Sequence, residues 1–123
     1  MPMPSLPDVA REARSWPDRY IEFLRQRSMS AGVYVLPAGS ADRQSPHRED
    51  EVYYVTQGRA RFQQGEETRS VAPGDVLFVP AGEPHRFLDI AEELVLLVVF
   101  APPEGPGTPA PAGGPDRIRT PPP

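Results

Sequence analysis

Residues 74–89 read GDVLFVPAGEPHRFLD, and they say the most about the architecture of this chain. Their apolar run, VLFV, lies between two turn signals, a Pro-Gly-Asp sequence and the run PAGEP. His85 then opens a second short segment. Short apolar runs bounded by glycine and proline are typical of β-strands joined by tight turns, so we predict two strands here.

The same pattern extends to both sides of this stretch. Glycine and proline recur between short runs that are rich in β-branched and aromatic residues. The predicted strands cover residues 32–37, 51–57, 59–64, 68–72, 76–79, 85–88 and 93–100. In this scheme Gly58 ends the second strand, and residues 65–67 form a hairpin turn. The pattern predicts an all-β fold, either a sandwich or a closed barrel.

Two other regions flank the strands, which we assign to one barrel domain of residues 32–101. Residues 1–31 form a predicted N-terminal arm, where apolar residues three and four positions apart predict a short amphipathic helix over residues 17–26. This helix would pack on the barrel or on a partner subunit. Residues 102–123 are rich in proline and have almost no large apolar side chain, so we predict an extended or disordered tail.

Composition excludes several classes of function. The chain of 123 residues suits one domain, and the absence of cysteine excludes disulfides, thiolate metal sites and thiol nucleophiles. All 13 basic residues are arginine, which excludes lysine Schiff-base chemistry and a P-loop lysine. The net charge of −4 does not indicate a surface that binds nucleic acid. No apolar run resembles a secretory signal or a membrane helix, so we expect a cytoplasmic protein without nucleic-acid or membrane partners.

The chain has two histidines, His47 and His85. Glu51 follows His47 by four residues, so both side chains would point to the same face of an extended strand. His85 comes directly after a turn, at the start of another predicted strand. Two imidazoles and one carboxylate are the facial ligand set that suits Fe(II) and, less distinctively, Mn, Ni or Zn. Taken singly, either histidine could equally be an ordinary surface or core residue.

Two stretches resemble the motifs of the cupin superfamily. Residues 39–58, GSADRQSPHREDEVYYVTQG, resemble the first motif, G-x5-H-x-H-x3,4-E-x6-G, with His47, Glu51 and Gly58 in register. Residues 74–89 resemble the second motif, G-x5-P-x-G-x2-H-x3-N. The positions that match there are Gly74, Pro80, Gly82 and His85.

This resemblance to small single-domain cupins of the cupin-2 type implies a double-stranded β-helix, or jelly-roll barrel. It also implies a divalent metal held by His47, Glu51 and His85. Two positions depart from the motifs, because Ser45 replaces the first histidine and Asp89 the final asparagine. Gln44, Ser45 or Glu49 could complete the ligand set, directly or through water. Alternatively, the metal has been lost and only a small-molecule pocket remains.

Further residues are candidates for the pocket. Tyr53 shares strand parity with Glu51, and Phe87 shares it with His85, so both would line the barrel interior near the site. Plain core packing is the alternative for each. Five arginines would lie on solvated strand faces, and one pointing inward would suggest an anionic substrate, although alternation does not choose among them. They are Arg48, Arg59, Arg61, Arg69 and Arg86.

Two functions follow from the resemblance. The first is a metal-dependent enzyme acting on a small oxygenated molecule, either an oxidoreductase of the dioxygenase kind or an isomerase, epimerase or decarboxylase. The second is a binding or sensing module without catalysis, with or without metal. We also expect a homodimer, because small cupins expose strand edges that must be covered.

Overall fold

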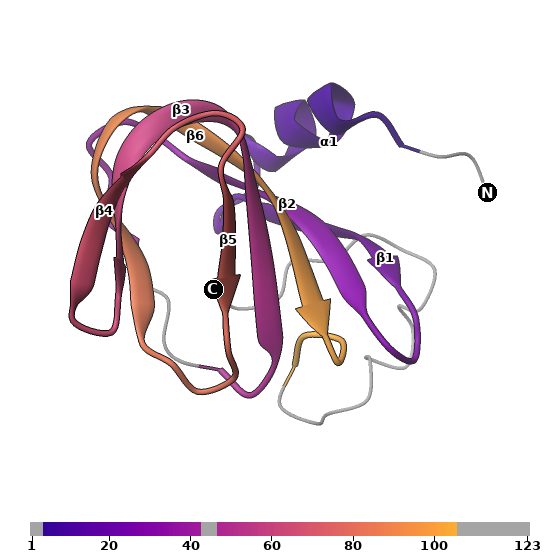
Figure 1. The fold of residues 1–123 in the computed structure, drawn as a ribbon. Coiled ribbons are helices and arrows are strands. Elements are labelled where there is room, and N and C mark those ends of the chain that lie inside the picture. The colour runs from indigo at the N-terminus through magenta and orange to yellow at the C-terminus, as the bar shows by residue number, and fades with distance from the viewer. Residues whose placement is uncertain (1–3, 43–46, 106–123) are drawn as a thin grey trace.

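The computed structural model describes residues 4–42 and 47–105 (Figure 1). Its elements, in chain order, are α1 (Leu6–Ala13), β1 (Tyr20–Arg25), β2 (Ser30–Leu36), β3 (Asp50–Gln64), β4 (Glu67–Val71), β5 (Val76–Val79) and β6 (His85–Ala101). All strand pairs are antiparallel, and one short helix accompanies them, which confirms the predicted all-β barrel. Gln44, Ser45 and most of the predicted tail, residues 106–123, lie outside the described residues.

The long strands β3 and β6 organise the barrel, because they pair along most of their length and belong to both of its layers. Their ladder runs from the pair Asp50 and Ala101 to the pair Gln64 and His85. The first half of β3 also pairs with β5, and its second half pairs with β4. On the other side, β2 pairs with the second half of β6, and β1 pairs with β2. The sheet therefore folds over on itself (Figure 1), and the main cluster of buried apolar side chains lies between its layers.

Gly58 lies where β3 bends from one layer into the other. The register of β3 against β6 shifts on both sides of this residue. Its φ of +99° is in the left-handed region, and a Cβ at this position would collide with the carbonyl oxygen of Glu93. The prediction that Gly58 ends a strand is therefore wrong. The strand continues through the glycine, which provides the bend.

The predicted helix at residues 17–26 is also wrong, since Tyr20–Arg25 is strand β1 and the helix is Leu6–Ala13. Three successive residues of β1 are buried, because its two faces pack on different groups. Tyr20 joins the barrel interior, whereas Ile21 packs under α1. Burial on both faces removes the alternation that normally identifies a strand, and it leaves apolar spacings that resemble those of a helix.

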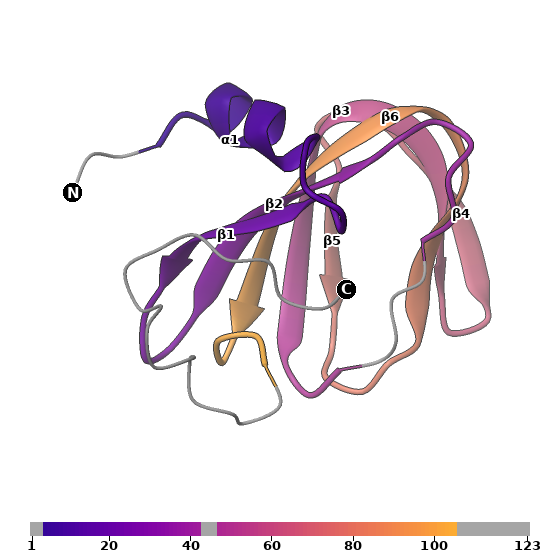
Figure 2. The same ribbon diagram turned by 180° about the vertical axis from the view of Figure 1, so that it is seen from behind.

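Helix α1 begins at Ser5, whose side chain accepts a hydrogen bond from the backbone N–H of Asp8. The helix lies outside the sheet, over β1 and β2 (Figure 2). A small core outside the barrel joins it to the sheet through Val9, Ala10, Ala13, Ile21, Val33, Val35 and Val95. Just after the helix, Arg14 forms a two-pronged pair with Glu93 of β6, with 3.0 Å between Nη2 and Oε1. The inner face of the sheet thus remains available for the site.

Candidate metal centre

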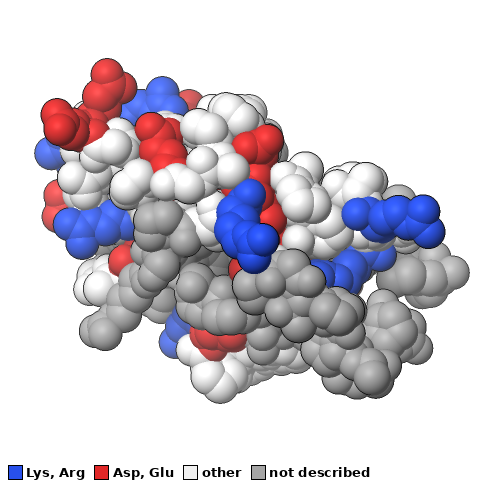
Figure 3. Space-filling view, turned by 90° about the horizontal axis from the view of Figure 1, so that it is seen from below, with Lys and Arg blue, Asp and Glu red and all other residues white. Residues whose placement is uncertain are grey.

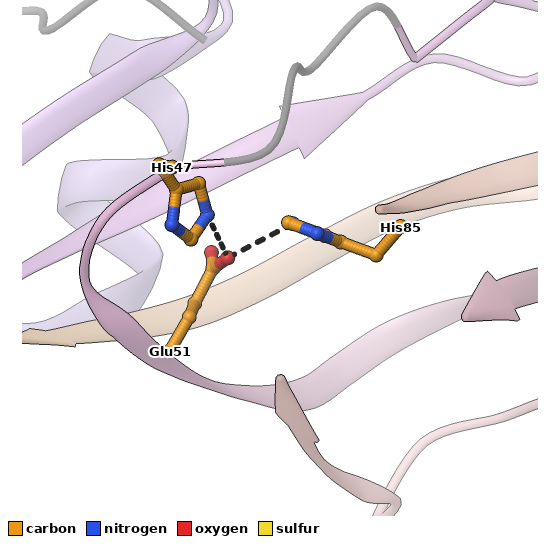
Figure 4. Close-up of side chains that lie close together, drawn as sticks. All are labelled: His47, Glu51 and His85. Atoms are coloured by element: carbon orange, nitrogen blue, oxygen red, sulfur yellow. Dashed lines mark hydrogen bonds and ion pairs between the residues drawn. The ribbon is translucent and has the colours of Figure 1, made fainter. Parts of the chain in front are cut away.

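His47 and Glu51, which are close in sequence, meet the distant His85 at one end of the barrel interior (Figure 4). His47 lies in the loop before β3, Glu51 is the second residue of β3, and His85 is the first residue of β6. Glu51 and His85 lie at opposite ends of the ladder between β3 and β6. The bend at Gly58 folds the ladder over, so these ends face each other across the interior.

The Glu51 carboxylate lies between the two imidazoles. Its Oε1 is 2.7 Å from His47 Nε2 and 3.1 Å from His85 Nε2. One ligand atom from each of the three residues lies within 4.8 Å of the others. Glu51 and His85 are buried, and His47 is partly exposed. Two of the candidate ligands are therefore shielded from solvent, and the third, His47, is partly accessible to it.

Backbone carbonyl groups orient both imidazoles. His47 Nδ1 donates to the carbonyl oxygen of Glu49 at 3.1 Å, and His85 Nδ1 donates to that of Glu83 at 2.9 Å. With the proton on Nδ1, each neutral ring directs the lone pair of Nε2 toward the Glu51 carboxylate. This arrangement, with the outer nitrogen bonded to a carbonyl and the inner one left to coordinate, is the usual support for metal-ligating histidines.

The convergent atoms require a positive charge among them. Two nitrogen lone pairs and a carboxylate oxygen repel one another unless a proton or a metal ion lies between them. Among the described residues, His85 Nε2 and Glu51 Oε2 are buried without a hydrogen-bond partner. Such buried, unsatisfied atoms are costly, and a cation would satisfy both. The donor set therefore fits a divalent metal ion.

The protonation of His47 reflects the same charge balance. Burial by itself would lower the pKa of this imidazole. The hydrogen bond and the negative charge of Glu51, together with smaller contributions from Glu49, outweigh burial and raise the pKa above its usual value. A proton on His47 thus competes with a metal for the same position.

Glu49 lies on the other edge of the His47 ring. Its Oε1 is 3.5 Å from His47 Nδ1, and its Oε2 accepts a hydrogen bond from the backbone N–H of Gly105 at 2.9 Å. The Nε2 edge of the ring, in contrast, faces Glu51. The Glu49 carboxylate therefore lies on the side of the His47 ring that faces away from Glu51. Gln44 and Ser45, the other two proposed ligands, lie outside the described residues.

The two predicted pocket residues form an aromatic wall beside the site. Tyr53 and Phe87 are fully buried, and their ring centroids are 5.0 Å apart. The centroid of the Tyr53 ring is 6.0 Å from that of His85. Both side chains belong to the main core cluster, so they combine packing with closeness to a ligand residue.

Sequence analysis did not identify Asp42. This residue lies in the loop after β2 and is hydrogen-bonded to the backbone of Phe87 in the aromatic wall. Its carboxylate is buried and accepts hydrogen bonds from the hydroxyl of Tyr34 at 3.2 Å and from the backbone N–H of Phe87 at 2.8 Å. Burial and the neighbouring Asp42 carboxylate raise the pKa of Tyr34 far above its usual value, so the hydroxyl remains a donor. Asp42 lies in a loop with no periodic pattern, and nothing in the sequence distinguishes it from the surface acids.

Comparison with known proteins identifies the family. The family model for the cupin domain matches residues 32–100. The chain is a cupin. An uncharacterized protein of Streptomyces coelicolor is 55% identical to this cupin over 85 residues, which are 69% of the chain and 81% of the relative. A crystal structure of a Thermus thermophilus protein superposes with a TM-score of 0.69 and 32% identity, covering 85% of this cupin and 100% of that chain.

A third relative has a named activity. Dimethylsulfoniopropionate lyase DddQ of Ruegeria pomeroyi is 37% identical over 74 residues, which are 59% of this cupin and 37% of the lyase. Its crystal structure gives a TM-score of 0.58 and 31% identity, covering 62% of this cupin and 39% of the lyase chain. This cupin therefore spans well under half of the lyase. Together the matches establish a small single-domain cupin with the double-stranded β-helix that the sequence predicted.

The departure at Asp89 has a backbone explanation. This residue occupies the place of the motif asparagine, and its φ is +48°. Asparagine and aspartate are the residues other than glycine that tolerate this left-handed conformation best. The exchange of asparagine for Asp89 thus preserves the backbone requirement of the position.

The outer surface adds two observations. In the described part of the chain, no helix has the length and apolar character needed to cross a membrane. The face in Figure 3 shows acidic and basic side chains interspersed, without a continuous basic surface among the residues drawn in colour. The absence of nucleic-acid partners remains a prediction.

Proposed function

We propose that this cupin binds a divalent transition metal through His47, Glu51 and His85 and acts on a small oxygenated molecule held there. The observation that supports this most is the pair of buried, unsatisfied atoms, His85 Nε2 and Glu51 Oε2, within a cluster of convergent donors. Two histidines and one carboxylate favour Fe(II), and Mn, Ni and Zn also suit these ligands.

Each part of the site has a distinct role in this proposal. His47 and His85 supply neutral Nε2 donors, and Glu51 supplies the negative charge. The carbonyl oxygens of Glu49 and Glu83 keep the Nδ1 protons in place. The buried rings of the aromatic wall exclude water from one side of the site. When bound, the metal would polarise a carbonyl or carboxylate oxygen and offer open coordination positions to a small ligand.

The reaction class is a narrower part of the proposal. Similarity to the lyase supports an elimination from a small acid, whereas the ligand set also suits dioxygenase and isomerase chemistry. A sensing module that binds a small molecule without turnover is the second candidate, supported by how little of the lyase this cupin spans.

Metal content tests the proposed site. Elemental analysis of protein purified without chelators should find about one divalent transition metal per chain. Glu51→Gln and His85→Ala should each reduce this content by about tenfold or more, because each removes a buried ligand. Glu92→Gln changes one exposed carboxylate on the same strand as His85 and should leave the content unchanged. Wild-type metal content near zero, or equal content in all variants, would contradict the proposal.

Turnover assays separate the reaction classes. Metal-loaded protein should be tested for oxygen consumption with diketones, catechols and thiols, and for release of dimethyl sulfide from dimethylsulfoniopropionate. Oxygen uptake that disappears in Glu51→Gln would support an oxygenase, and sulfide release without oxygen uptake would support a lyase. Saturable binding of one of these compounds without turnover would favour the sensing module.

A further inference from the structure

Arg69 lies on the inward-facing side of β4, the strand at one end of the strand order, and it is exposed to solvent. Its partner in the register with β3 is Phe62, which is fully buried in the main core cluster. Residues that are directly opposite on paired strands share a face, so Arg69 lies on the inner face. Arg61 alternates with the buried Ala60 and Phe62 and therefore lies on the outer face.

Arg69 also lines a cavity close to the candidate metal centre. The cavity, of about 270 Å³, is bounded by Phe62, Gln64, Glu67, Thr68 and Arg69. The centroid of the Phe62 ring is 6.2 Å from that of His85, and Gln64 is the register partner of His85 on β3. The cavity thus shares two of its wall residues with the immediate surroundings of a candidate ligand.

Within the described residues, the guanidinium of Arg69 is exposed and forms no hydrogen bond or ion pair. The Gln64 amide donates to Glu83 Oε1 at 2.8 Å and to the carbonyl oxygen of Phe78 at 2.7 Å, which engages one nearby acid. Glu67 also borders the cavity, but it is exposed and forms no ion pair with Arg69. An exposed arginine that borders a cavity can bind a carboxylate with two parallel hydrogen bonds.

We propose that Arg69 binds a carboxylate of the ligand, so that the substrates of this cupin are small carboxylic acid anions. In this proposal the carboxylate lies in the cavity beside Arg69, and the rest of the ligand extends from there toward His47, Glu51 and His85. This assignment of substrate class rests on the proposed function, since the second oxygen needs the metal. The contact with Arg69 itself does not need it.

Isothermal titration calorimetry with dicarboxylates tests the proposal in zinc-loaded and metal-free protein. Malonate, succinate and glutarate present two carboxylates at increasing separation, and succinamate replaces one carboxylate of succinate by a neutral amide. The variants are Arg69→Gln and the matched control Arg61→Gln, which removes the same charge from the outer face of the neighbouring strand. Both arginines are exposed, so neither variant should unfold the protein.

The zinc-loaded wild type should bind at least one of the three dicarboxylates. Arg69→Gln should weaken that binding by about tenfold or more, and Arg61→Gln should change it by less than about twofold. Succinamate should bind more weakly than succinate to the wild type and equally to Arg69→Gln. Equal effects of the two substitutions, equal affinity for succinate and succinamate, or no dicarboxylate binding would overturn the proposal.

Failure of the proposed metal site can be distinguished from failure of the proposed Arg69 contact by titrating metal-free protein. If the protein takes up no zinc, the proposed function fails and the metal-free titrations decide about Arg69. Weaker binding of dicarboxylates to metal-free Arg69→Gln than to metal-free Arg61→Gln would then support the anion site. Equal binding to both variants, or none, would overturn it.

Discussion

Glu104 is a buried acid that no sequence pattern singles out. Its backbone N–H donates to Ser30 Oγ at 2.9 Å, and its carbonyl oxygen accepts from Arg25 Nη2 at 2.9 Å. The residue is only 8% exposed, and burial, followed by the charge of Glu49, raises the pKa of the carboxyl to about 7. The other charged groups that act on it are His47, which lowers the pKa, and Glu22 and Glu51, which raise it.

The raised pKa predicts that metal-free protein loses stability as the pH rises from about 4.5 through about 7. Over this range the folded carboxyl keeps its proton while the unfolded one has lost it, so deprotonation favours the unfolded state. Glu104→Gln should raise the free energy of unfolding at pH 8 by about 1–3 kcal/mol and change it little at pH 5. Urea unfolding in the presence of EDTA measures both values.

Glu92→Gln, at an exposed position, is the control for this charge change. It should shift stability by less than about 0.5 kcal/mol at either pH. If the difference between pH 5 and pH 8 is the same in Glu104→Gln as in the wild type, the predicted role of Glu104 is wrong.

Single residues were predictable from sequence where spacing alone identifies them. The separation of four between His47 and Glu51, and the turn before His85, allowed the three to be proposed as a set, although His47 lies in the loop before β3 and not on a shared strand face. Arg69 could be assigned to the inner face only once its pairing with Phe62 was known. Asp42 and Glu104 depend on tertiary burial, which no local pattern encodes.

The bend in β3 requires a glycine at position 58, so a substitution there should destabilise the protein. Gly58→Ala should destabilise the protein by about 3 kcal/mol or more, because the added Cβ meets the Glu93 carbonyl and the φ of +99° is strained for alanine. Gly74→Ala is a matched control, since Gly74 has a φ of +97° but no atom within 4 Å of an added Cβ. It should cost only about 1–2 kcal/mol.

Thermal and urea unfolding of both variants separate the collision from the strain. Equal losses of stability in Gly58→Ala and Gly74→Ala would show that the close contact at the bend does not matter. A larger loss in Gly58→Ala should come with lower metal content, because Glu51 and His85 meet only when β3 bends there.

The strands β2, β4 and β5 were predictable because glycine and proline turns bound short apolar runs, whereas α1 and β1 were missed and β3 and β6 were each predicted as two strands. β1 packs on the interior and on α1 at once, so its pattern resembled a helix. β3 continues through a glycine that would end most strands, because the partner strand β6 accepts the bend through register shifts. In both cases the deciding contacts come from another part of the chain.

The molecule as a whole has an apolar outer surface beside the part that α1 covers. Phe78 and Val76 of β5 are 54% and 64% exposed, and they pair with Val52 and Tyr54 of β3. The chain has no lysine, the residue that most often protects exposed strands against association. We expect the predicted homodimer to form here, with a second copy covering this uncharged surface.

Size-exclusion chromatography with light scattering should give twice the chain mass of 13.5 kDa. Phe78→Ser should shift the protein toward monomer without unfolding it, because the side chain contributes little to the core. A wild-type protein that is monomeric at micromolar concentration would contradict the prediction, and a dimer unaffected by Phe78→Ser would place the interface elsewhere.

The fold-over of β3 and β6 also determines which state of the chain a metal ion can recognise. His47 and Glu51 are close in sequence, but His85 lies beside them only in a barrel whose long-range ladder is formed and bent. A metal ion can therefore recognise the finished barrel and not its local segments. By binding the native state alone, it would slow unfolding, and chelation during refolding should leave the folding rate unchanged while shortening the lifetime of the folded protein.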